Sequence, residues 1–239
     1  MSLPPDGSAA TTAPFSGRNI LITGATGGLG AALSEALATR GATIVLLGKN
    51  IAKLESLYDH LESLSAPQAA IYPLDLTGSS PTEFAELASI VEKELGGLHA
   101  LLHCAGDMGP LSPLELQTSG ALAKTLATNL QGPMLLTQAC LPLLKAQASS
   151  HLGFTLNTNY QAYYGGYALA NGAMHALFEL CTKELENSSV YTFAVRPPPM
   201  RTAMRRQAYP AESIDTLMPP EQCIDAYIRA LDCDSRDNH

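Results

Sequence analysis

A glycine-rich segment, Thr23-Gly24-Ala25-Thr26-Gly27-Gly28-Leu29-Gly30, follows directly after the apolar run Ile20-Leu21-Ile22. Gly24 allows a sharp turn off a strand, Gly28 lets a pyrophosphate approach the backbone, and Gly30 permits close packing of the next helix on the sheet. The free backbone N–H groups and the positive end of that helix then attract phosphate groups. Because an amphipathic stretch follows the glycines, the segment predicts a dinucleotide-binding loop rather than a turn without a ligand.

The end of the second predicted strand, Gly48-Lys49-Asn50, carries an ammonium group and no carboxylate. An acidic residue at this place usually binds the ribose hydroxyls of NAD. Lys49 can instead form a charge-assisted hydrogen bond with a 2′-phosphate. The sequence therefore favours NADP(H) over NAD(H). The alternative is that Lys49 only keeps a surface loop soluble.

From about residue 16 to its end, the chain resembles the short-chain dehydrogenase/reductase family. The spacing Thr-Gly-x-x-x-Gly-x-Gly, the pair Ala105-Gly106 and a tyrosine at the start of a long helix carry the likeness. The resemblance implies an oxidoreductase that transfers hydride between NADP(H) and a small carbonyl or alcohol substrate. It assigns cofactor binding to Thr23, Gly24, Thr26, Gly28, Leu29, Gly30, Lys49, Asp75, Leu76, Cys104, Ala105, Gly106 and Thr202.

Some of these positions have particular roles in the resemblance. Asp75 matches the carboxylate that accepts from the adenine amino group, although Asp-Leu-Thr also suits a helix N-cap or a turn. His103-Cys104 replaces two asparagines of the family. Thr202 matches the residue that contacts the nicotinamide amide. Pro197-Pro198 replaces a Pro-Gly pair, so one backbone N–H is missing from that cradle.

The resemblance also implies catalytic residues, and here the chain departs from the family's serine, tyrosine and lysine. Tyr167 matches the tyrosine, and Asn171 stands four residues later at the lysine position. Thr158 is the nearest match to the serine, although its connection to Tyr167 is four residues shorter than usual. Asn129 matches the helix asparagine that holds a catalytic water, and a mid-helix asparagine is unfavourable without a purpose. Alternatively, the tyrosines from Tyr160 to Tyr167 form an aromatic pocket wall.

The asparagine at position 171 predicts weakened or modified catalysis. An ammonium group about 4 Å from the tyrosine oxygen would favour the phenolate by roughly 4 kcal/mol at an effective dielectric of 20. Without that group, Tyr167 should remain a phenol at neutral pH, which suits carbonyl reduction better than alcohol oxidation. His175 lies one helical turn beyond Asn171, and we expect a packed or interfacial histidine there rather than a replacement cation.

The elements that must position these residues alternate between strand and helix. Strands are predicted at 19–23, 43–47, 69–74, 100–104, 153–157 and 190–195, and helices at 29–40, 51–63, 81–95, 122–144, 167–187 and 220–231. The strands are continuous apolar runs, as expected when helices cover both faces of a sheet. The pattern predicts an α/β fold, a doubly wound parallel sheet (Rossmann fold) in a single domain. The seventh edge strand usual in the family is missing, and region 197–220 is expected to be irregular.

Composition argues against several classes of function. The 239 residues are 46% apolar, enough for one substantial core, and their formal charge of −8 disfavours nucleic acid or an anionic membrane as partner. No apolar run approaches the roughly 20 residues of a membrane span. The five scattered cysteines predict reduced thiols, with no disulfide framework and no metal site. We expect residues 1–15 to form a flexible tail before a domain at 16–239, in a cytoplasmic protein.

Two functions are compatible with these residues. The first is an NADP(H)-dependent reductase of a small carbonyl compound with weakened or modified catalysis. The second is a catalytically inactive nucleotide-binding relative that acts as a sensor or partner subunit. A homodimer through the helices at 122–144 and 167–187 is expected in either case.

Overall fold

Six parallel strands form one sheet in the order β3-β2-β1-β4-β5-β6. The structure is a computed structural model that describes residues 13–157 and 160–233. The strands are β1 (Asn19–Thr23), β2 (Thr43–Gly48), β3 (Ala70–Pro73), β4 (Ala100–His103), β5 (Ser150–Thr155) and β6 (Val190–Val195). The strand order reverses between β1 and β4, and ligands of open α/β sheets bind in the crevice at such a reversal. The predicted doubly wound parallel sheet is confirmed.

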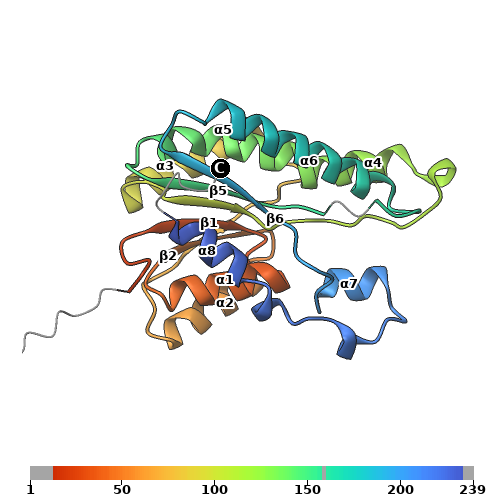
Figure 1. Cartoon of the computed structure of the whole chain (residues 1–239), viewed down its shortest axis with the longest axis horizontal. Helices are drawn as coiled ribbons and strands as arrows, with labels where there is room; N and C mark the ends of the chain where they lie inside the picture. The colour runs from red at the N-terminus through yellow and green to blue at the C-terminus, as the bar shows by residue number, and fades with distance from the viewer. Residues whose placement is uncertain (1–12, 158–159, 234–239) are drawn as a thin grey trace, which may run out of the picture.

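Helices cover both faces of the sheet (Figure 1). One face carries α1 (Gly28–Ala38), α2 (Ile51–Ser63) and α8 (Asp225–Asp232). The other carries α3 (Pro81–Leu95), α4 (Ser119–Leu126), α5 (Gly132–Lys145) and α6 (Gly165–Glu184). A short helix, α7 (Ala203–Ala208), lies away from these layers, in the segment between β6 and α8. Among the residues that the structure describes, no helix is long and apolar enough to cross a membrane.

The sheet separates two apolar cores, because successive side chains of a strand point to opposite faces. In β1, Leu21 packs with side chains of α3, α5 and α6, whereas Ile20 and Ile22 pack with α1, α2 and α8. All three side chains are fully buried. Burial of such a side chain contributes about 1.5–3 kcal/mol. Apolar residues at consecutive positions therefore hold helices on both faces, as the continuous apolar runs predict.

Two predicted helices are each divided in the structure. The predicted helix at 122–144 consists of α4 and α5, joined by a π-helical turn over Ala127–Gln131, where Asn129 bonds to a neighbouring loop instead of extending a regular helix. The predicted helix at 220–231 consists of a 3-10 turn, Pro220–Gln222, followed by α8. The regular helix begins only at Asp225.

Two further boundaries correct the predictions. The fifth strand lies at Ser150–Thr155, three residues earlier than its predicted start, because the polar Ser150 is buried through a hydrogen bond to the Leu144 carbonyl group. The region 197–220 is not wholly irregular, since it contains α7 and a 3-10 turn at Ile214–Thr216. Thr202 caps α7 by accepting from the backbone N–H of Arg205 at 3.2 Å.

Candidate active site

The glycine-rich loop after β1 packs directly against the loop after β4. A Cβ atom at Gly24 would lie 2.7 Å from the Cα of Ala105, and one at Gly30 would collide with the Gly24 carbonyl group. Gly24 also has a φ of +63°, in the left-handed region that favours glycine. Close approach of backbone to backbone therefore explains why glycine stands at both positions.

The side chain of Thr23, at the end of β1, forms hydrogen bonds with the backbone of the loop after β4. Its fully buried Oγ1 accepts from the backbone N–H groups of Cys104 at 3.0 Å and Ala105 at 3.1 Å. The next helix, α1, has no side-chain cap at Gly27 and no acidic residue in its first turn. Its N-terminal N–H groups thus face the reversal point of the sheet without a competing carboxylate, which suits an anionic ligand.

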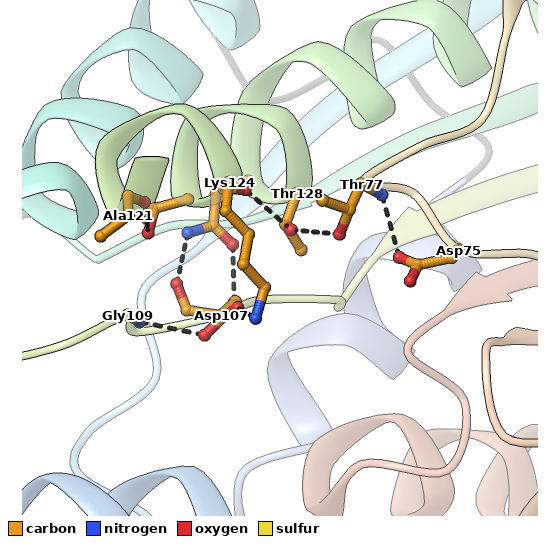
Figure 2. A network of polar contacts seen from close by, with 9 residues as sticks. Asp75, Thr77, Asp107, Gly109, Ala121, Lys124 and Thr128 are labelled. Carbon is orange, nitrogen blue, oxygen red and sulfur yellow. Dashed lines mark hydrogen bonds and ion pairs between the residues drawn. The ribbon is translucent and has the colours of Figure 1, made fainter. Parts of the chain in front are cut away.

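Asn129 ties the loop after β4 to the π-helical turn. Its Oδ1 accepts from the backbone N–H of Asp107 at 2.7 Å, and its Nδ2 donates to the Asp107 carbonyl oxygen at 2.6 Å. The Lys124 ammonium lies 3.4 Å from the Asp107 carboxylate (Figure 2). The buried Asn129 amide therefore positions the segment after Gly106.

Asp75 follows β3 and stands at the other end of this network (Figure 2). Its Oδ1 accepts from the backbone N–H of Thr77 at 3.0 Å, while the Thr77 hydroxyl lies 2.8 Å from that of Thr128. The Thr77 N–H, with a smaller contribution from Lys49 and Lys124, holds the pKa of the Asp75 carboxyl below its usual value. Asp75 thus stabilises a turn through the Thr77 N–H, and its exposed carboxylate can also accept a hydrogen bond from an adenine amino group.

His103 and Cys104, which replace two asparagines, are neutral groups at neutral pH. The His103 Nε2 lies 2.8 Å from the Thr137 hydroxyl, and burial lowers the pKa of this histidine to about 3. Burial also raises the pKa of the Cys104 thiol to about 12, and Thr155 donates to its sulfur at 3.7 Å. Contact with a ribose at this point therefore falls to the backbone of Cys104, Ala105 and Gly106.

Tyr167 lies among amide side chains at the carboxyl end of β5. The Asn157 Nδ2 donates to the Tyr167 hydroxyl at 3.4 Å. Asn171 accepts from the backbone N–H of Asn157 at 3.1 Å and donates to the Tyr167 carbonyl oxygen at 3.0 Å. Asn171 is buried, and these two bonds tie the end of β5 to the start of α6. Asn171 therefore places a neutral amide, with a structural role, at the position where the resemblance implies a lysine.

Asn157 is the site residue that sequence reasoning missed. The assignment of Thr158 depended on a strand that extended to residue 157, and Thr158 itself lies outside the described residues. The observed strand ends at Thr155, so Asn157 is already in the loop that faces α6. The polar Asn157-Thr158 pair after an apolar run was the available clue, and only the packing of this loop on α6 shows that Asn157 contacts the tyrosine.

His175 is a packed surface histidine, as predicted. Its Nε2 lies 3.1 Å from the Arg196 guanidinium and 3.6 Å from the Glu179 carboxylate. Its ring stacks on Phe178 with the centroids 6.4 Å apart. Since these partners lie along α6 and at the end of β6, His175 is held away from the Tyr167 hydroxyl.

Residues of the segment after β6 cover the same cleft. A Cβ atom at Gly28 would lie 2.8 Å from the Cγ2 of Thr202, and one at Gly106 would lie 3.2 Å from the Cε of Met204. The absence of a side chain at both glycines therefore leaves room for Thr202 and Met204. Thr202 packs against Gly28 of the glycine-rich loop, and its contact with a nicotinamide amide stays a prediction.

The remaining predicted cofactor residues fall into two groups. Thr26 and Lys49 stand at the end of β2, where the Thr26 hydroxyl is 3.8 Å from a Cβ built on Gly48, and the Lys49 side chain is exposed. Leu29 and Leu76 are buried apolar residues, and Leu76 packs on Gly132 of α5. Their side chains hold the loops in place, so any contact of these two with a cofactor would involve the backbone.

The arrangement brings together a phenol, an amide donor and a glycine-lined cleft. The phenol of Tyr167 can donate a proton to a carbonyl oxygen, and the Asn157 amide can donate a hydrogen bond beside it. Asp75, the glycine-rich loop and Thr202 each follow the carboxyl end of a strand, the edge of the sheet where ligands of this fold bind. These features suit hydride transfer from a dinucleotide to a polarised carbonyl group.

Comparison with known proteins agrees with this geometry. The sequence profile of the short chain dehydrogenases matches residues 18–213. The uncharacterized oxidoreductase YciK of Escherichia coli (strain K12) is 30% identical over 222 residues, which span 92% of this chain and 88% of that protein.

Two solved structures show the same fold. One from Pseudomonas syringae, provisionally assigned to the short chain dehydrogenases, is 34% identical, has a TM-score of 0.92, and is matched over 97% of this chain and 95% of its own. Another from Shigella flexneri, with the same provisional assignment and complexed with NADP, is 29% identical, has a TM-score of 0.91, and is matched over 95% of each chain. On this evidence the chain belongs to the short-chain dehydrogenase/reductase family of oxidoreductases.

Proposed function

We propose that this oxidoreductase is an NADP(H)-dependent reductase of small carbonyl compounds with weakened catalysis. The observation that carries the proposal is the Tyr167 hydroxyl, which lies 3.4 Å from the Asn157 amide and near a neutral residue, Asn171, instead of a lysine. Bound NADPH would supply the hydride. Tyr167 would give its proton to the carbonyl oxygen of the substrate, while Asn157 donates a hydrogen bond that supports the developing charge.

The direction of the reaction follows from the missing cation. Carbonyl reduction needs the phenol form of Tyr167, which is the ordinary form of a tyrosine at neutral pH. Alcohol oxidation needs the phenolate, which a lysine at position 171 would stabilise and Asn171 does not. The site therefore favours reduction over oxidation, at a rate below that of a site with a lysine.

The cofactor preference is supported by charge at the end of β2. Lys49 is exposed there, and an open pocket of about 490 Å³ between α1 and α2 is lined by Thr26, Lys53 and Ser56 among others. The lining thus offers one ammonium group and two hydroxyl groups to a ribose 2′-phosphate, and Lys49 adds a second ammonium group just before α2. The NADP in the Shigella flexneri structure supports the same assignment.

Titration of the protein with NADPH and with NADH tests this preference. Replacing Lys49 or Lys53 with Gln should weaken NADPH binding by about tenfold, since a hydrogen bond to a charged group contributes about 1.5–3 kcal/mol, and leave NADH binding unchanged. Lys93→Gln on α3 is a matched control, because its ammonium pairs with Glu94 on the protein surface. Failure of the wild-type protein to bind either nucleotide at millimolar concentration would exclude the proposed function.

Turnover against a panel of carbonyl compounds separates a weak reductase from an inactive relative. Tyr167→Phe should abolish NADPH oxidation, whereas Tyr160→Phe should retain most of it, since Tyr160 is 58% exposed. Tight NADPH binding without turnover on any carbonyl would favour the alternative function, a nucleotide-binding sensor or partner subunit.

We also propose that the protein forms a homodimer through α4, α5 and α6. α6 presents Leu169 and Leu180 to solvent in the isolated chain, with 57% and 55% of their surfaces exposed. Light scattering of the wild-type protein and of a Leu169→Glu, Leu180→Glu double variant tests this: the variant should be a monomer, and an unchanged mass would exclude this interface.

A further inference from the structure

The segment between β6 and α8 has its own internal structure. Arg201 donates to the Ile214 carbonyl oxygen at 3.1 Å, and Met200 pairs with Met218 in a β-bridge that joins the two ends of the segment. Arg205 forms a two-pronged ion pair with Glu212, with both N···O distances at 2.6 Å. These contacts lie within residues 200–218, so the segment can move as one unit.

One side chain of this unit holds it to the loop that precedes α6. The Tyr209 hydroxyl lies 2.6 Å from the Tyr164 hydroxyl and donates to the Gln161 side chain at 3.0 Å. The Arg205 guanidinium stacks on the Tyr209 ring at 3.9 Å from its centroid, which fixes the orientation of the ring. Within the described residues, these two hydrogen bonds link residues 200–218 to the connection between β5 and α6.

The partner of Tyr209 is presented by an unusual backbone. Tyr163 has a φ of +71°, and its side chain is 61% exposed, whereas the next residue, Tyr164, is only 3% exposed. The Tyr164 ring contacts the Tyr167 ring edge to face, with the centroids 5.8 Å apart. The left-handed turn at Tyr163 thus places Tyr164 between Tyr209 and the tyrosine of the active site.

The same unit covers the cofactor cleft. Thr202 crosses above Gly28, and the Met204 side chain reaches Gly106 on the other side of the cleft. A dinucleotide that binds between the loops after β1 and β4 therefore has to pass beneath residues 200–218. In Figure 1 α7 lies beside the sheet with few neighbours, which is consistent with such a movement.

We propose that the Tyr164–Tyr209 hydroxyl pair is a latch that holds residues 200–218 closed over the cofactor cleft and that opens to admit the dinucleotide. The latch is a feature of the chain itself, and its role in cofactor entry rests on the proposed NADP(H) dependence. Because Tyr164 also contacts Tyr167, closing the latch sets the wall of the active site next to the proton donor. Tyr164 and Tyr209 are positioning residues in this proposal.

Limited trypsin digestion of the cofactor-free protein tests the latch without any assumption about activity. Arg205 of α7 is the cleavage site that opening frees, since its side chain is only 22% exposed and is paired with Glu212. Tyr209→Phe keeps the ring under Arg205 and removes the hydrogen bonds to Tyr164 and Gln161, whereas Tyr164→Phe removes the bond to Tyr209 alone. Initial cleavage should therefore accelerate roughly fivefold in Tyr164→Phe, the effect of losing one ordinary hydrogen bond, and by more than this in Tyr209→Phe. The double variant should match Tyr209→Phe, since the shared bond is already lost there. Tyr163→Phe, at an exposed neighbouring position, is the matched control.

Stopped-flow measurement of NADPH binding tests the second part. The association rate should rise in Tyr164→Phe and Tyr209→Phe by factors similar to those for cleavage, and stay at the wild-type value in Tyr163→Phe. Unchanged cleavage in both latch variants, with unfolding temperatures equal to that of the wild type, would overturn the latch. Absence of NADPH binding in every variant would contradict the proposed function instead, and the digestion result would still decide the latch.

Discussion

The loops after β1 and β4 and the connection between β5 and α6 represent two different ways to build a site. The first region uses the backbone: Gly24, Gly30 and the N–H groups around Ala105 define its shape, and Thr23 bonds only to main-chain groups. The second region depends on side chains, namely Tyr167 with two asparagine amides. Substitutions such as His103 and Cys104 leave a backbone site intact, whereas a change at Asn171 alters the chemistry directly.

The two regions also differ in charge. Asp75, Lys49 and Lys124 interact electrostatically at the adenosine end of the cleft. At the tyrosine end, the residues that contact Tyr167 in the described chain are the neutral Asn157, Asn171 and Tyr164. Charged groups thus lie beside Asp75, whereas the groups that touch Tyr167 directly are neutral, and the Arg205 guanidinium on that side stacks on Tyr209 rather than on Tyr167. Binding and turnover can therefore be disturbed separately.

The largest effect is expected from Gly30→Ala in the backbone-based region. The new methyl group would lie 2.9 Å from the Ala25 Cα and against the Gly24 carbonyl group, so the loop must shift or α1 must leave the sheet. NADPH binding should fall by more than a hundredfold in a fluorescence titration. Gly120→Ala on α4 is the control, since nothing lies within 4 Å of its added Cβ, and it should bind NADPH normally. Normal binding by Gly30→Ala would show that the loop does not hold the cofactor.

The next prediction asks which polar group assists Tyr167. Asn157→Ala should lower kcat for carbonyl reduction by roughly tenfold to a hundredfold, because loss of a hydrogen-bond donor to developing charge has effects of about this size or larger. Thr158→Ala should lower kcat less than threefold if Asn157 is the donor. The opposite ranking would restore Thr158 as the match to the family's serine, and Asn157→Ser tests whether a hydroxyl can replace the amide.

The buried histidine of β4 predicts a pH effect on stability rather than on chemistry. Burial lowers the pKa of His103 to about 3, whereas the unfolded chain binds a proton near pH 6.5. The folded state is therefore fully favoured above pH 6.5, and this contribution is lost as the pH falls toward 3. Between pH 8 and pH 5 the free energy of unfolding should drop by about 2 kcal/mol from this group. Urea unfolding of His103→Gln should show a smaller decrease, and an equal decrease would contradict the assignment.

The smallest effect is expected from Asn171→Lys in the side-chain-based region. An ammonium group at this position should favour the phenolate and raise alcohol oxidation by several-fold more than carbonyl reduction, with a lower pH optimum for oxidation. The variant also leaves the Asn157 N–H without its acceptor, so stability should fall by about 1–3 kcal/mol. Asn171→Met is the control for side-chain length. Equal oxidation and reduction rates in the lysine and methionine variants would show that charge at this position does not limit the reaction.

The glycine-rich loop, the doubly wound parallel sheet and the helix that carries Tyr167 could be predicted from the sequence, because each leaves a pattern in neighbouring residues. The left-handed backbone at Gly24 is favoured by glycine itself, and each buried strand corresponds to a run of consecutive apolar residues. Asn129 was identified as unusual for a helix, but its bonds to Asp107, 22 residues earlier in the chain, could not be deduced from spacing. The π-helical turn at Ala127–Gln131 left no pattern in the sequence that distinguishes it from a regular helix.

The sequence by itself determined the family fold, the glycine-rich loop after β1, the basic residue after β2 and the asparagine four residues after Tyr167. Only the tertiary structure decided that Asn157 contacts the Tyr167 hydroxyl and that Asn171 links the end of β5 to the start of α6. It also decided that Tyr209 reaches Tyr164, 45 residues earlier in the chain. Local backbone preferences are set by a few adjacent residues, whereas contacts between loops depend on where the sheet's register and the helix packing bring them.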